Sequence, residues 1–345
     1  MSMKAWQVTA YGANGNPGDT ISKLVLNHDV KIPIAKEAQV VIKVECCAIN
    51  PLDWKLFSGH MQAMFPLTFP YITCLDVSGT ISAVGAGVTS LVVGDKVCTV
   101  LSTSYENGGL AQYTVAMADN VSKRKSLTAE TAAGLPLAGL TAYYTFGAAS
   151  KTSGLALGKL TGKGQKLLIL GGSTAVGQYA IQLAKNAGLM VTVTCNAKAT
   201  MPDGSTKADY LKSLGADETI DYKEVDPMTV LTGQGFDHIL DAAGSVDDWS
   251  KAPGVLKAGG DYVTIANFVS QKSPEDKVNL QHFMLKSCPS SDLDFLVDLV
   301  EKGVVKVLID SVYDFEDAQV AFMKSFEMAT KGSGAMGKLV VKVPQ

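Results

Sequence analysis

A strand that turns directly into a helix through a glycine-rich loop limits what this chain of 345 residues can fold into. The apolar run KLLIL (166–170) is followed by GGSTAVG (171–177) and by a helix-like segment that ends at Gly188. Such a turn directs backbone N–H groups and the positive end of the helix dipole toward one point, and glycine lets a phosphate approach closely. The segment therefore predicts a dinucleotide-binding turn.

The surrounding sequence strengthens this prediction. Gly172 and Gly177 occupy the first and third positions of the G-x-G-x-x-G fingerprint, whereas Thr174 replaces the middle glycine, so the bare pattern is weak. From about residue 163 to 265, however, strand-like and helix-like segments alternate, which predicts a doubly wound parallel sheet. An ordinary glycine-containing turn would not predict Gly244 at one strand end and Gly259 before another strand.

The first part of the chain has a different texture. Short runs rich in Val, Ile and Thr alternate with glycine-containing turns up to about residue 121, which predicts a β-rich module. After residue 265 we expect a helix at 291–303, a strand at 305–310 (VKVLID), a helix at 316–326 and a final strand at 337–343. The chain is therefore expected to be an α/β protein with two domains.

Composition excludes several classes of protein. Hydrophobic residues make up 47% and charged residues 18%, which excludes a disordered chain, and a net charge of -3 disfavours nucleic-acid binding. The six cysteines have no CxxC spacing and are expected to be reduced thiols. Two uncharged stretches, 131–150 and 167–184, contain glycines and are expected to be buried core rather than integral membrane segments. No targeting signal is visible, so a cytoplasmic location is expected, with organelle association left open.

The choice of nicotinamide cofactor depends on the strand after the glycine turn. An acidic residue about 20 residues beyond the turn would bind the ribose 2'-hydroxyl of NAD. Here MVTVTC (190–195) is followed by Asn196 and Lys198, and the first acidic residue is Asp203. A lysine and an amide suit the 2'-phosphate of NADPH, which is the predicted cofactor. The alternative for Lys198 is a solvated loop lysine.

Motifs along nearly the whole chain resemble one enzyme family. They are NPLDWK (50–55), PYITCLDVSG (70–79), VGAGVTSLVVGDKV (84–97), LPLAGLTA (135–142), the glycine turn, LGADETIDY (214–222), FDHILDAAG (236–244), LKAGGDYV (256–263) and Gly337-Lys338. The chain is similar to the zinc-free quinone oxidoreductase branch of the medium-chain dehydrogenase/reductase superfamily. Within it, NPLDWK most resembles the chloroplast-envelope quinone oxidoreductase homologues and the mitochondrial reticulon-interacting oxidoreductases.

The resemblance implies an architecture and a set of site residues. A GroES-like β-rich catalytic domain, 1–130 and 306–345, would enclose a Rossmann NADPH-binding domain, 131–305, with the nicotinamide in the cleft between them. Asn50 would lie beside the nicotinamide and substrate, and Thr141 would lie near the cofactor. The implied pyrophosphate residues are Gly172, Ser173, Thr174, Ala175, Val176 and Gly177, those at the 2'-phosphate are Asn196, Lys198 and Tyr222, and those on the nicotinamide side are Ala266, Phe268, Ala335 and Met336. MPDGSTK (201–207) lengthens the loop after Lys198 and alters the expected shape of the phosphate pocket.

Two further interpretations concern the catalytic domain. Asn50, Leu75, Asp76 and the region of Ala138 stand where zinc alcohol dehydrogenases carry their catalytic ligands, so no metal site is expected. Lys55 and Asp76 are candidate catalytic residues, with a structural salt bridge as the favoured alternative role. Apolar side chains after Asn50 would either line a substrate mouth or pack in the core; they are Trp54, Phe57, Met61, Met64 and Phe65.

The resulting functional hypothesis is an NADPH-dependent, metal-independent reductase of quinones or α,β-unsaturated carbonyls, in the sense of an alkenal/one reductase. It would act by direct hydride transfer, and the Asn50 amide would stabilise the negative charge that develops on the conjugated oxygen. The alternatives are a 2-enoyl thioester reductase and an NADPH-binding protein with a structural or interaction role. The partner is expected to be a small molecule, and a homodimer is left open.

Overall fold

The computed structural model describes residues 1–13, 15–102, 108–146, 164–201, 203–245, 247–266, 278–285, 289–331 and 336–345. The chain divides into two compact units. The first comprises Met1–Leu137, Lys286–Gly303 and Val307–Gln345, and the second comprises Ala138–Leu285 and Val304–Lys306. The first unit therefore includes 131–137 and 286–303, which the sequence-based boundaries placed in the dinucleotide-binding domain.

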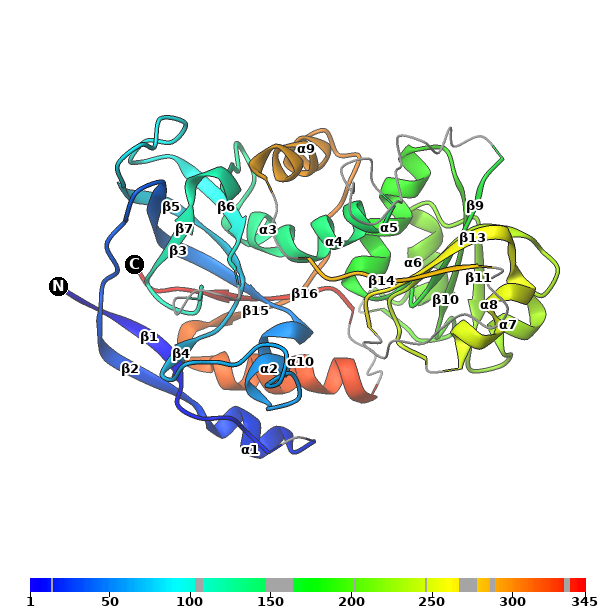
Figure 1. The fold of residues 1–345 in the computed structure, drawn as a ribbon, viewed down its shortest axis with the longest axis horizontal. Coiled ribbons are helices and arrows are strands. Elements are labelled where there is room, and N and C mark those ends of the chain that lie inside the picture. The colour runs from blue at the N-terminus through cyan, green and yellow to red at the C-terminus, as the bar shows by residue number, and fades with distance from the viewer. Residues whose placement is uncertain are drawn as a thin grey trace. The chain divides into compact units, whose positions relative to one another are not determined.

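The first unit is built on two sheets (Figure 1). A three-stranded sheet has the order β2-β1-β4, and a seven-stranded sheet has the order β15-β16-β3-β5-β6-β8, with β7 paired to β3. The strands are β1 (Ser2–Val8), β2 (Leu24–Lys31), β3 (Gln39–Ile49), β4 (Tyr71–Ile72), β5 (Asp76–Val84), β6 (Lys96–Val100), β7 (Tyr113–Met117), β8 (Ser122–Lys123), β15 (Ile309–Asp314) and β16 (Lys338–Lys342). The helices are α1 (Pro17–Ser22), α2 (Pro51–Phe57), α3 (Ala129–Gly134), α9 (Ser290–Glu301) and α10 (Ala318–Lys331).

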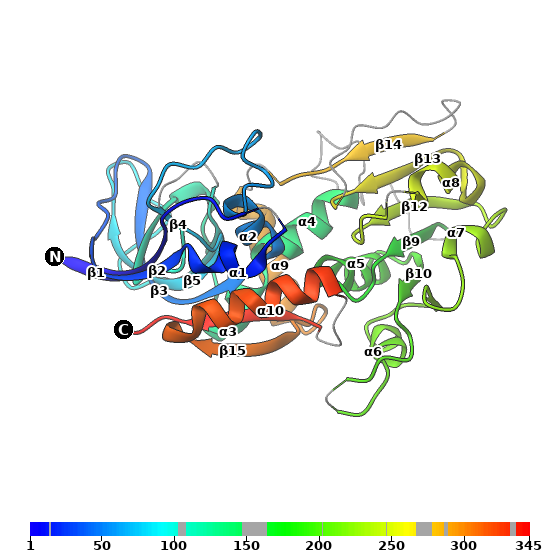
Figure 2. The same cartoon turned by 90° about the horizontal axis from the view of Figure 1, so that it is seen from below.

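The second unit contains a six-stranded parallel sheet with the order β11-β10-β9-β12-β13-β14 (Figure 2). Numbered from its first strand, this is the order 3-2-1-4-5-6 of a doubly wound dinucleotide-binding sheet. The strands are β9 (Lys166–Leu170), β10 (Met190–Cys195), β11 (Glu218–Asp221), β12 (Phe236–Asp241), β13 (Leu256–Thr264) and β14 (Asn279–His282). The helices are α5 (Ala175–Asn186), α6 (Lys207–Ser213), α7 (Pro227–Val230) and α8 (Asp248–Val255), while α4 (Pro136–Phe146) begins at the boundary of the two units. The predicted α/β class is confirmed.

The central strand of this sheet is buried on both faces. Leu168 and Leu170 of β9 belong to an apolar core that also contains Met228 of α7 and Val255 of α8. Because side chains alternate along a strand, Leu167 points to the opposite face, and it too is buried. This two-sided burial explains the continuous apolar run KLLIL.

The chain departs from the sequence-based elements at two places. Gly259 was expected to lie before a strand, but α8 ends at Val255 and β13 already begins at Leu256, so Gly259 lies within the strand. The strand expected at 305–310 is also wrong, because β15 begins at Ile309, which pairs with Lys338 of β16. An apolar run shows that a segment is buried, whereas its strand partner decides where the strand starts.

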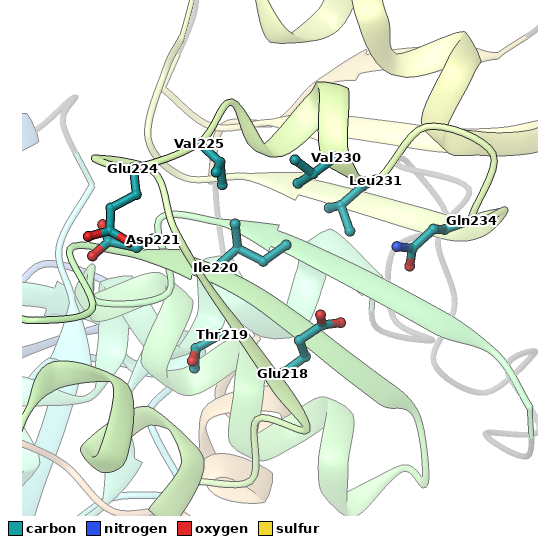
Figure 3. A pocket seen from close by; sticks show the side chains of 9 residues that line it. All are labelled: Glu218, Thr219, Ile220, Asp221, Glu224, Val225, Val230, Leu231 and Gln234. Atoms are coloured by element: carbon teal, nitrogen blue, oxygen red, sulfur yellow. The ribbon is translucent and has the colours of Figure 1, made fainter.

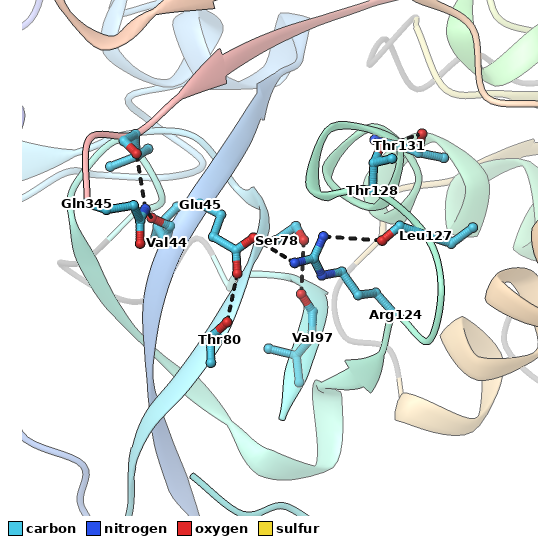
Figure 4. Close-up of polar contacts among 11 residues, drawn as sticks. Val44, Glu45, Ser78, Thr80, Val97, Arg124, Leu127, Thr128, Thr131 and Gln345 are labelled. Carbon is cyan, nitrogen blue, oxygen red and sulfur yellow. Dashed lines mark hydrogen bonds and ion pairs between the residues drawn. The ribbon is translucent and has the colours of Figure 1, made fainter. Parts of the chain in front are cut away.

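A partly buried ion pair connects β3 to the segment after β8 (Figure 4). Arg124 Nη2 lies 2.6 Å from Glu45 Oε2, and the Arg124 side chain is only 5% exposed. Arg124 Nη1 also donates to the carbonyl oxygen of Leu127 at 3.2 Å, and the Thr80 hydroxyl donates to Glu45 Oε1 at 2.7 Å. The guanidinium therefore depends on Glu45 for its counter-charge.

Replacement of this counter-charge should destabilise the first unit. Glu45→Gln should lower the free energy of unfolding by about 1–3 kcal/mol, because it leaves a buried guanidinium without its charged acceptor. The control is Lys251→Met, which removes a pair with Asp226 whose side chains are 45% and 40% exposed and should cost less than about 1 kcal/mol. Urea denaturation measures both, and equal losses would contradict the prediction.

Candidate functional site

The glycine turn lies at the carboxyl end of β9, where the strand order of the parallel sheet reverses between β9 and β12. Gly171 N donates to Thr194 Oγ1 and Gly172 N donates to the Thr194 carbonyl oxygen, both at 2.9 Å. A Cβ on Gly172 would lie 2.8 Å from the Cβ of Val193, and one on Gly177 would lie 2.4 Å from the Gly171 carbonyl oxygen. These two positions therefore require glycine, as the fingerprint predicts.

Thr174 replaces the middle glycine without strain. Its backbone is extended, with φ −68° and ψ 157°, so a side chain is tolerated there. Its hydroxyl accepts a hydrogen bond from Gly177 N and donates one to the Gly171 carbonyl oxygen, both at 2.9 Å. Thr174 is thus the N-cap of α5 and fixes the turn through its side chain.

The turn has the chemistry that a pyrophosphate requires. Helix α5 is 12 residues long, and the N–H groups of its first turn, at Ala175 and Val176, have no partner within the helix. Ser173, Ala175 and Val176, which carry N–H groups of this turn, are partly exposed residues. Together with the helix dipole they fit the diphosphate of a nicotinamide dinucleotide.

The next two strands bring a cation and a carboxylate to the same edge of the sheet. Asn196 and Lys198 follow β10, Tyr222 follows β11, and Tyr222 N donates to the Cys195 carbonyl oxygen at 3.3 Å. The exposed ammonium of Lys198 forms an ion pair with Glu224, and this pairing raises the pKa of Lys198. No sequence pattern pointed to Glu224, because it lies 26 residues after Lys198 and reaches it only through β11.

Further residues gather at the ends of β12 and β13. Asp241 Oδ1 accepts from Ala243 N at 3.0 Å and from Gly244 N at 2.7 Å, and its Oδ2 accepts from the Thr264 hydroxyl at 2.8 Å. A Cβ on Gly244 would lie 3.0 Å from the Cβ of Ala266. Ala266, which was predicted on the nicotinamide side, therefore lies against the loop that Asp241 holds through its hydrogen bonds. No sequence signal assigned this organising role to Asp241.

A cavity of about 340 Å³ lies beside β11 (Figure 3). It is lined by Glu218, Thr219, Ile220, Asp221, Glu224, Val225, Val230, Leu231 and Gln234. Three of these side chains are carboxylates, and a carboxylate repels phosphate. This cavity is therefore unsuited to the phosphate groups of a dinucleotide.

In the first unit, Asn50 is part of a buried polar cluster. Asn50 Nδ2 donates to Asp76 Oδ2 at 2.9 Å, and Lys338 Nζ donates to Asn50 Oδ1 at 2.5 Å. Lys338 Nζ also lies 3.0 Å from Asp76 Oδ2, and Leu137 N donates to Asp76 Oδ1 at 2.7 Å. Asn50, Asp76 and Lys338 are 4%, 0% and 3% exposed, so the cluster is almost fully removed from water.

Asp53 extends this cluster and holds the backbone of Asn50. Its carboxyl accepts from Asn50 N at 2.7 Å and from Leu75 N at 3.0 Å. Burial raises the pKa of Asp53 to about 7, and the nearby charge of Asp76 acts in the same direction. The pattern Asn50-Pro51-x-Asp53 is a helix-start signal that could have identified this role.

The other predicted residues of the first unit differ in their partners and in how far they are buried. Asp76 does form a buried ion pair, but with Lys338, whereas Lys55 forms none among the described residues and lies 5.8 Å from the Trp54 ring centroid. Burial lowers the pKa of Lys55. Trp54, Phe57 and Met61 are buried, and the first two pack against Phe326 and Phe322 of α10. Met64 is exposed and Phe65 is partly buried.

Four predicted cofactor residues remain. Thr141 is buried in α4, and Met336, also buried, precedes β16 and donates from its backbone N–H to Asp310 Oδ1 at 3.2 Å. Phe268 and Ala335 lie outside the described residues.

Within the described part of the chain there is no group of three or more His, Cys, Asp and Glu side chains placed to hold a metal ion. Nor does that part contain a helix long and apolar enough to cross a membrane.

Two family models match the chain. The alcohol dehydrogenase GroES-like domain matches residues 36–126, and the zinc-binding dehydrogenase model matches residues 214–341. These matches confirm the GroES-like and Rossmann-type architecture that the sequence predicts.

Full-length relatives agree with these matches. The chain is 34% identical to the chloroplast envelope quinone oxidoreductase homolog of Arabidopsis thaliana, over 99% of this chain and 98% of that protein. It is 33% identical to 2-methylene-furan-3-one reductase of Solanum lycopersicum, over 98% of this chain and 79% of that protein. The solved structure of the quinone oxidoreductase from Coxiella burnetii superposes with a TM-score of 0.80 at 26% identity and covers 100% of both chains. The name of the plant protein from Arabidopsis places it at a chloroplast envelope, unlike the cytoplasmic location expected here.

The raised pKa of Asp53 predicts a pH-dependent stability. Between pH 4 and about 7 the folded chain holds a proton that the unfolded chain releases, so the contribution of Asp53 to the free energy of unfolding falls as pH rises. The free energy of unfolding of Asp53→Asn minus that of the wild type should therefore be larger at pH 7.5 than at pH 5.0, as measured by urea denaturation. In the control Asp226→Asn, the pKa of the replaced group is about 2, so the difference should be the same at both pH values. A pH-independent difference for Asp53→Asn would contradict the assignment.

Proposed function

Because the chain belongs to the medium-chain dehydrogenase/reductase superfamily, we propose that it is an NADPH-dependent, metal-independent reductase of quinones or α,β-unsaturated carbonyl compounds. The chain is an oxidoreductase enzyme and uses a nicotinamide cofactor. The observation that carries the proposal is the glycine turn at the point where the parallel strand order reverses, capped by Thr174 and open at the first turn of α5.

Residues at the edge of the parallel sheet support the proposed preference for NADPH. The N–H groups around Ser173 to Val176 would bind the pyrophosphate, and Asn196, Lys198 and Tyr222 would bind the 2'-phosphate. The ammonium of Lys198 is already held by Glu224, so the phosphate would compete with this carboxylate. The phosphate and the ammonium would then form a charge-assisted contact that NADH lacks.

Asn50 is the proposed electrophilic group. When bound, the cofactor supplies a hydride to an electron-poor carbon of the substrate, and negative charge develops on the conjugated oxygen. An N–H of the Asn50 amide would stabilise this oxygen, because a preorganised donor in a buried site strengthens as charge develops. Solvent would supply the proton, with the ammonium of Lys55 as a second candidate donor.

The groups around Asn50 support the proposed metal independence. Two oxygens that could bind a cation, Asn50 Oδ1 and Asp76 Oδ2, both lie within 3.0 Å of the Lys338 ammonium. A divalent metal ion at these oxygens would face a fixed positive charge. The residues therefore support hydrogen-bond rather than Lewis-acid activation.

The proposal is tested by NADPH oxidation with four substrates: 1,4-benzoquinone, 9,10-phenanthrenequinone, acrolein and a crotonyl thioester. Turnover of a quinone or of acrolein supports the proposed function. Turnover of the thioester alone favours a 2-enoyl thioester reductase. NADPH binding without turnover of any substrate would favour a structural or interaction role and would contradict the proposal.

Cofactor preference gives the first prediction of the proposed function. NADPH should bind at least tenfold more tightly than NADH, a difference of about 1.4 kcal/mol, and Lys198→Ala should remove most of it. Glu224→Gln is the matched variant, because it frees the ammonium from its competitor and should preserve or increase the preference. Fluorescence titration measures all three proteins, and equal affinities of the wild type for the two cofactors would contradict the assignment.

Removal of metal ions gives the second prediction. Exhaustive dialysis against a chelator should leave the rate of NADPH oxidation unchanged, because the proposed activation uses the Asn50 amide. Elemental analysis of the dialysed protein is the control. Loss of activity that returns on addition of zinc would show that the enzyme depends on a metal.

The Asn50 amide gives the third prediction. Asn50→Ala should lower kcat by roughly tenfold or more, since loss of one oxyanion donor costs about 2.7–4 kcal/mol and a shared donor less. NADPH affinity should change much less. Asn27→Ala, which removes an exposed amide in β2, is the control and should keep the wild-type kcat. A folded Asn50→Ala protein with wild-type kcat on both a quinone and an enone would assign Asn50 a structural role.

A further inference from the structure

The Asn50 amide is held between two opposite charges. Its Oδ1 accepts from the Lys338 ammonium at 2.5 Å, and its Nδ2 donates to the Asp76 carboxylate at 2.9 Å. These residues come from three separate parts of the first unit: the start of α2, the start of β5 and the start of β16. No sequence pattern assigned a role to Lys338.

This arrangement allows only one orientation of the amide. Rotation by 180° would place the Nδ2 hydrogens against an ammonium and Oδ1 against a carboxylate, and both contacts would be repulsive. An asparagine amide has two N–H donors, and one of them is used by Asp76. The orientation therefore also fixes the direction of the second N–H.

The partners of Asn50 are themselves restrained. Asp76 Oδ1 accepts from Leu137 N at 2.7 Å, so the carboxylate cannot rotate freely. The backbone of Asn50 is held by Asp53, which accepts from its N–H at 2.7 Å. A positive charge on Oδ1 also polarises the amide and makes its N–H groups stronger donors.

We propose that Lys338 and Asp76 are positioning residues that lock and polarise the Asn50 amide, so that its second N–H is presented as the hydrogen-bond donor to the substrate oxygen. This inference rests on the proposed function of Asn50. Lys338 and Asp76 act through Asn50 and contact no reacting atom. The burial of an ion pair is costly, and its use as an orienting device offers a reason for its presence in this core.

The variants must keep the cluster neutral. Lys338→Met alone would leave Asp76 buried without a counter-charge and would destabilise the fold, so the main variant is the pair Asp76→Asn with Lys338→Met. The single carbonyl oxygen of the amide introduced by Asp76→Asn could still accept from Asn50, with loss of the contact to Leu137 N, whereas the positive charge on Asn50 Oδ1 would be lost. The matched control is Lys342→Met on the same strand, since Lys342 is exposed and pairs with Glu130.

A kinetic cycle measures whether the pair acts through Asn50. The Asp76→Asn, Lys338→Met protein should lose roughly tenfold in kcat, with a change in the KM of the quinone of less than about threefold. Adding Asn50→Ala to this protein should then cost less than about threefold, although the same substitution costs roughly tenfold in the wild type. If Asn50→Ala instead lowered kcat by the same factor in this protein as in the wild type, the losses would be multiplicative. That result would overturn the inference, because it would show that the pair and Asn50 act independently. Lys342→Met should keep the wild-type kcat.

A second measurement needs no enzymatic activity. In protein labelled with ¹⁵N-asparagine, the side-chain amide signal of Asn50 is identified by its absence in Asn50→Ala. In the wild type its Nδ2 protons should exchange with solvent slowly, and in the Asp76→Asn, Lys338→Met protein at least about tenfold faster, because the restraint on the amide is weaker. Lys342→Met should leave the signal unchanged.

The two readouts separate the inference from the proposed function. An unchanged Asn50 signal in the neutralised variant would overturn the inference, whatever the activity of the enzyme. A wild type that is inactive with all four substrates would overturn the proposed function, and with it the catalytic part of the inference. Faster exchange together with a non-multiplicative kinetic cycle would support both.

Discussion

A buried ion pair between Asp76 and Lys338 joins two parts of the chain that lie 262 residues apart in sequence. Burying two charges is costly unless each is fully hydrogen-bonded. Here the amide of Asn50 bridges them and the backbone N–H of Leu137 satisfies the second carboxylate oxygen. The pair thus ties the C-terminal strand β16 to the strands of the N-terminal segment and defines the surroundings of the proposed electrophilic group.

The same cluster carries a second carboxyl group that behaves differently. Asp53 accepts two backbone hydrogen bonds, and burial raises its pKa to about 7. One ammonium therefore serves two buried carboxyl groups, of which Asp76 is paired directly with it and Asp53 is the one driven toward its neutral form. The total buried charge of the cluster is therefore small. Asn50 is held through its side chain by Asp76 and Lys338 and through its backbone by Asp53.

The second unit illustrates what a sequence can predict. Three of its features are local patterns: the glycine turn, the alternation of strands and helices, and the lack of an acidic residue directly after β10. Each pattern predicts the structure or the chemistry of the segment in which it occurs. Gly172 and Gly177 are required by close backbone and side-chain contacts, and Thr174 replaces a glycine because its position is extended. Local chemistry therefore specified most of this fold and the position of the turn.

Other features depend on which distant segments meet, and local patterns in a single sequence do not reveal these pairings. Lys338 reaches Asn50 only because β16 pairs with β3, and Glu224 reaches Lys198 only because β11 lies beside β10. The start of β15 was misplaced for the same reason, since its register with β16 decides which residues form the strand. The motif Gly337-Lys338 was visible in the sequence, but its role follows only from the residues that surround it.

Direct transfer of a hydride to a substrate carbon is the step on which the proposed chemistry depends, and isotope labelling measures it most directly. Acrolein would be reduced in ordinary water with NADPH that carries deuterium at C4, using each of the two C4 epimers in turn. One epimer should give propanal with a single deuterium at the former β-carbon, and the other should give unlabelled propanal. Propanal without deuterium at that carbon from both epimers would contradict direct hydride transfer.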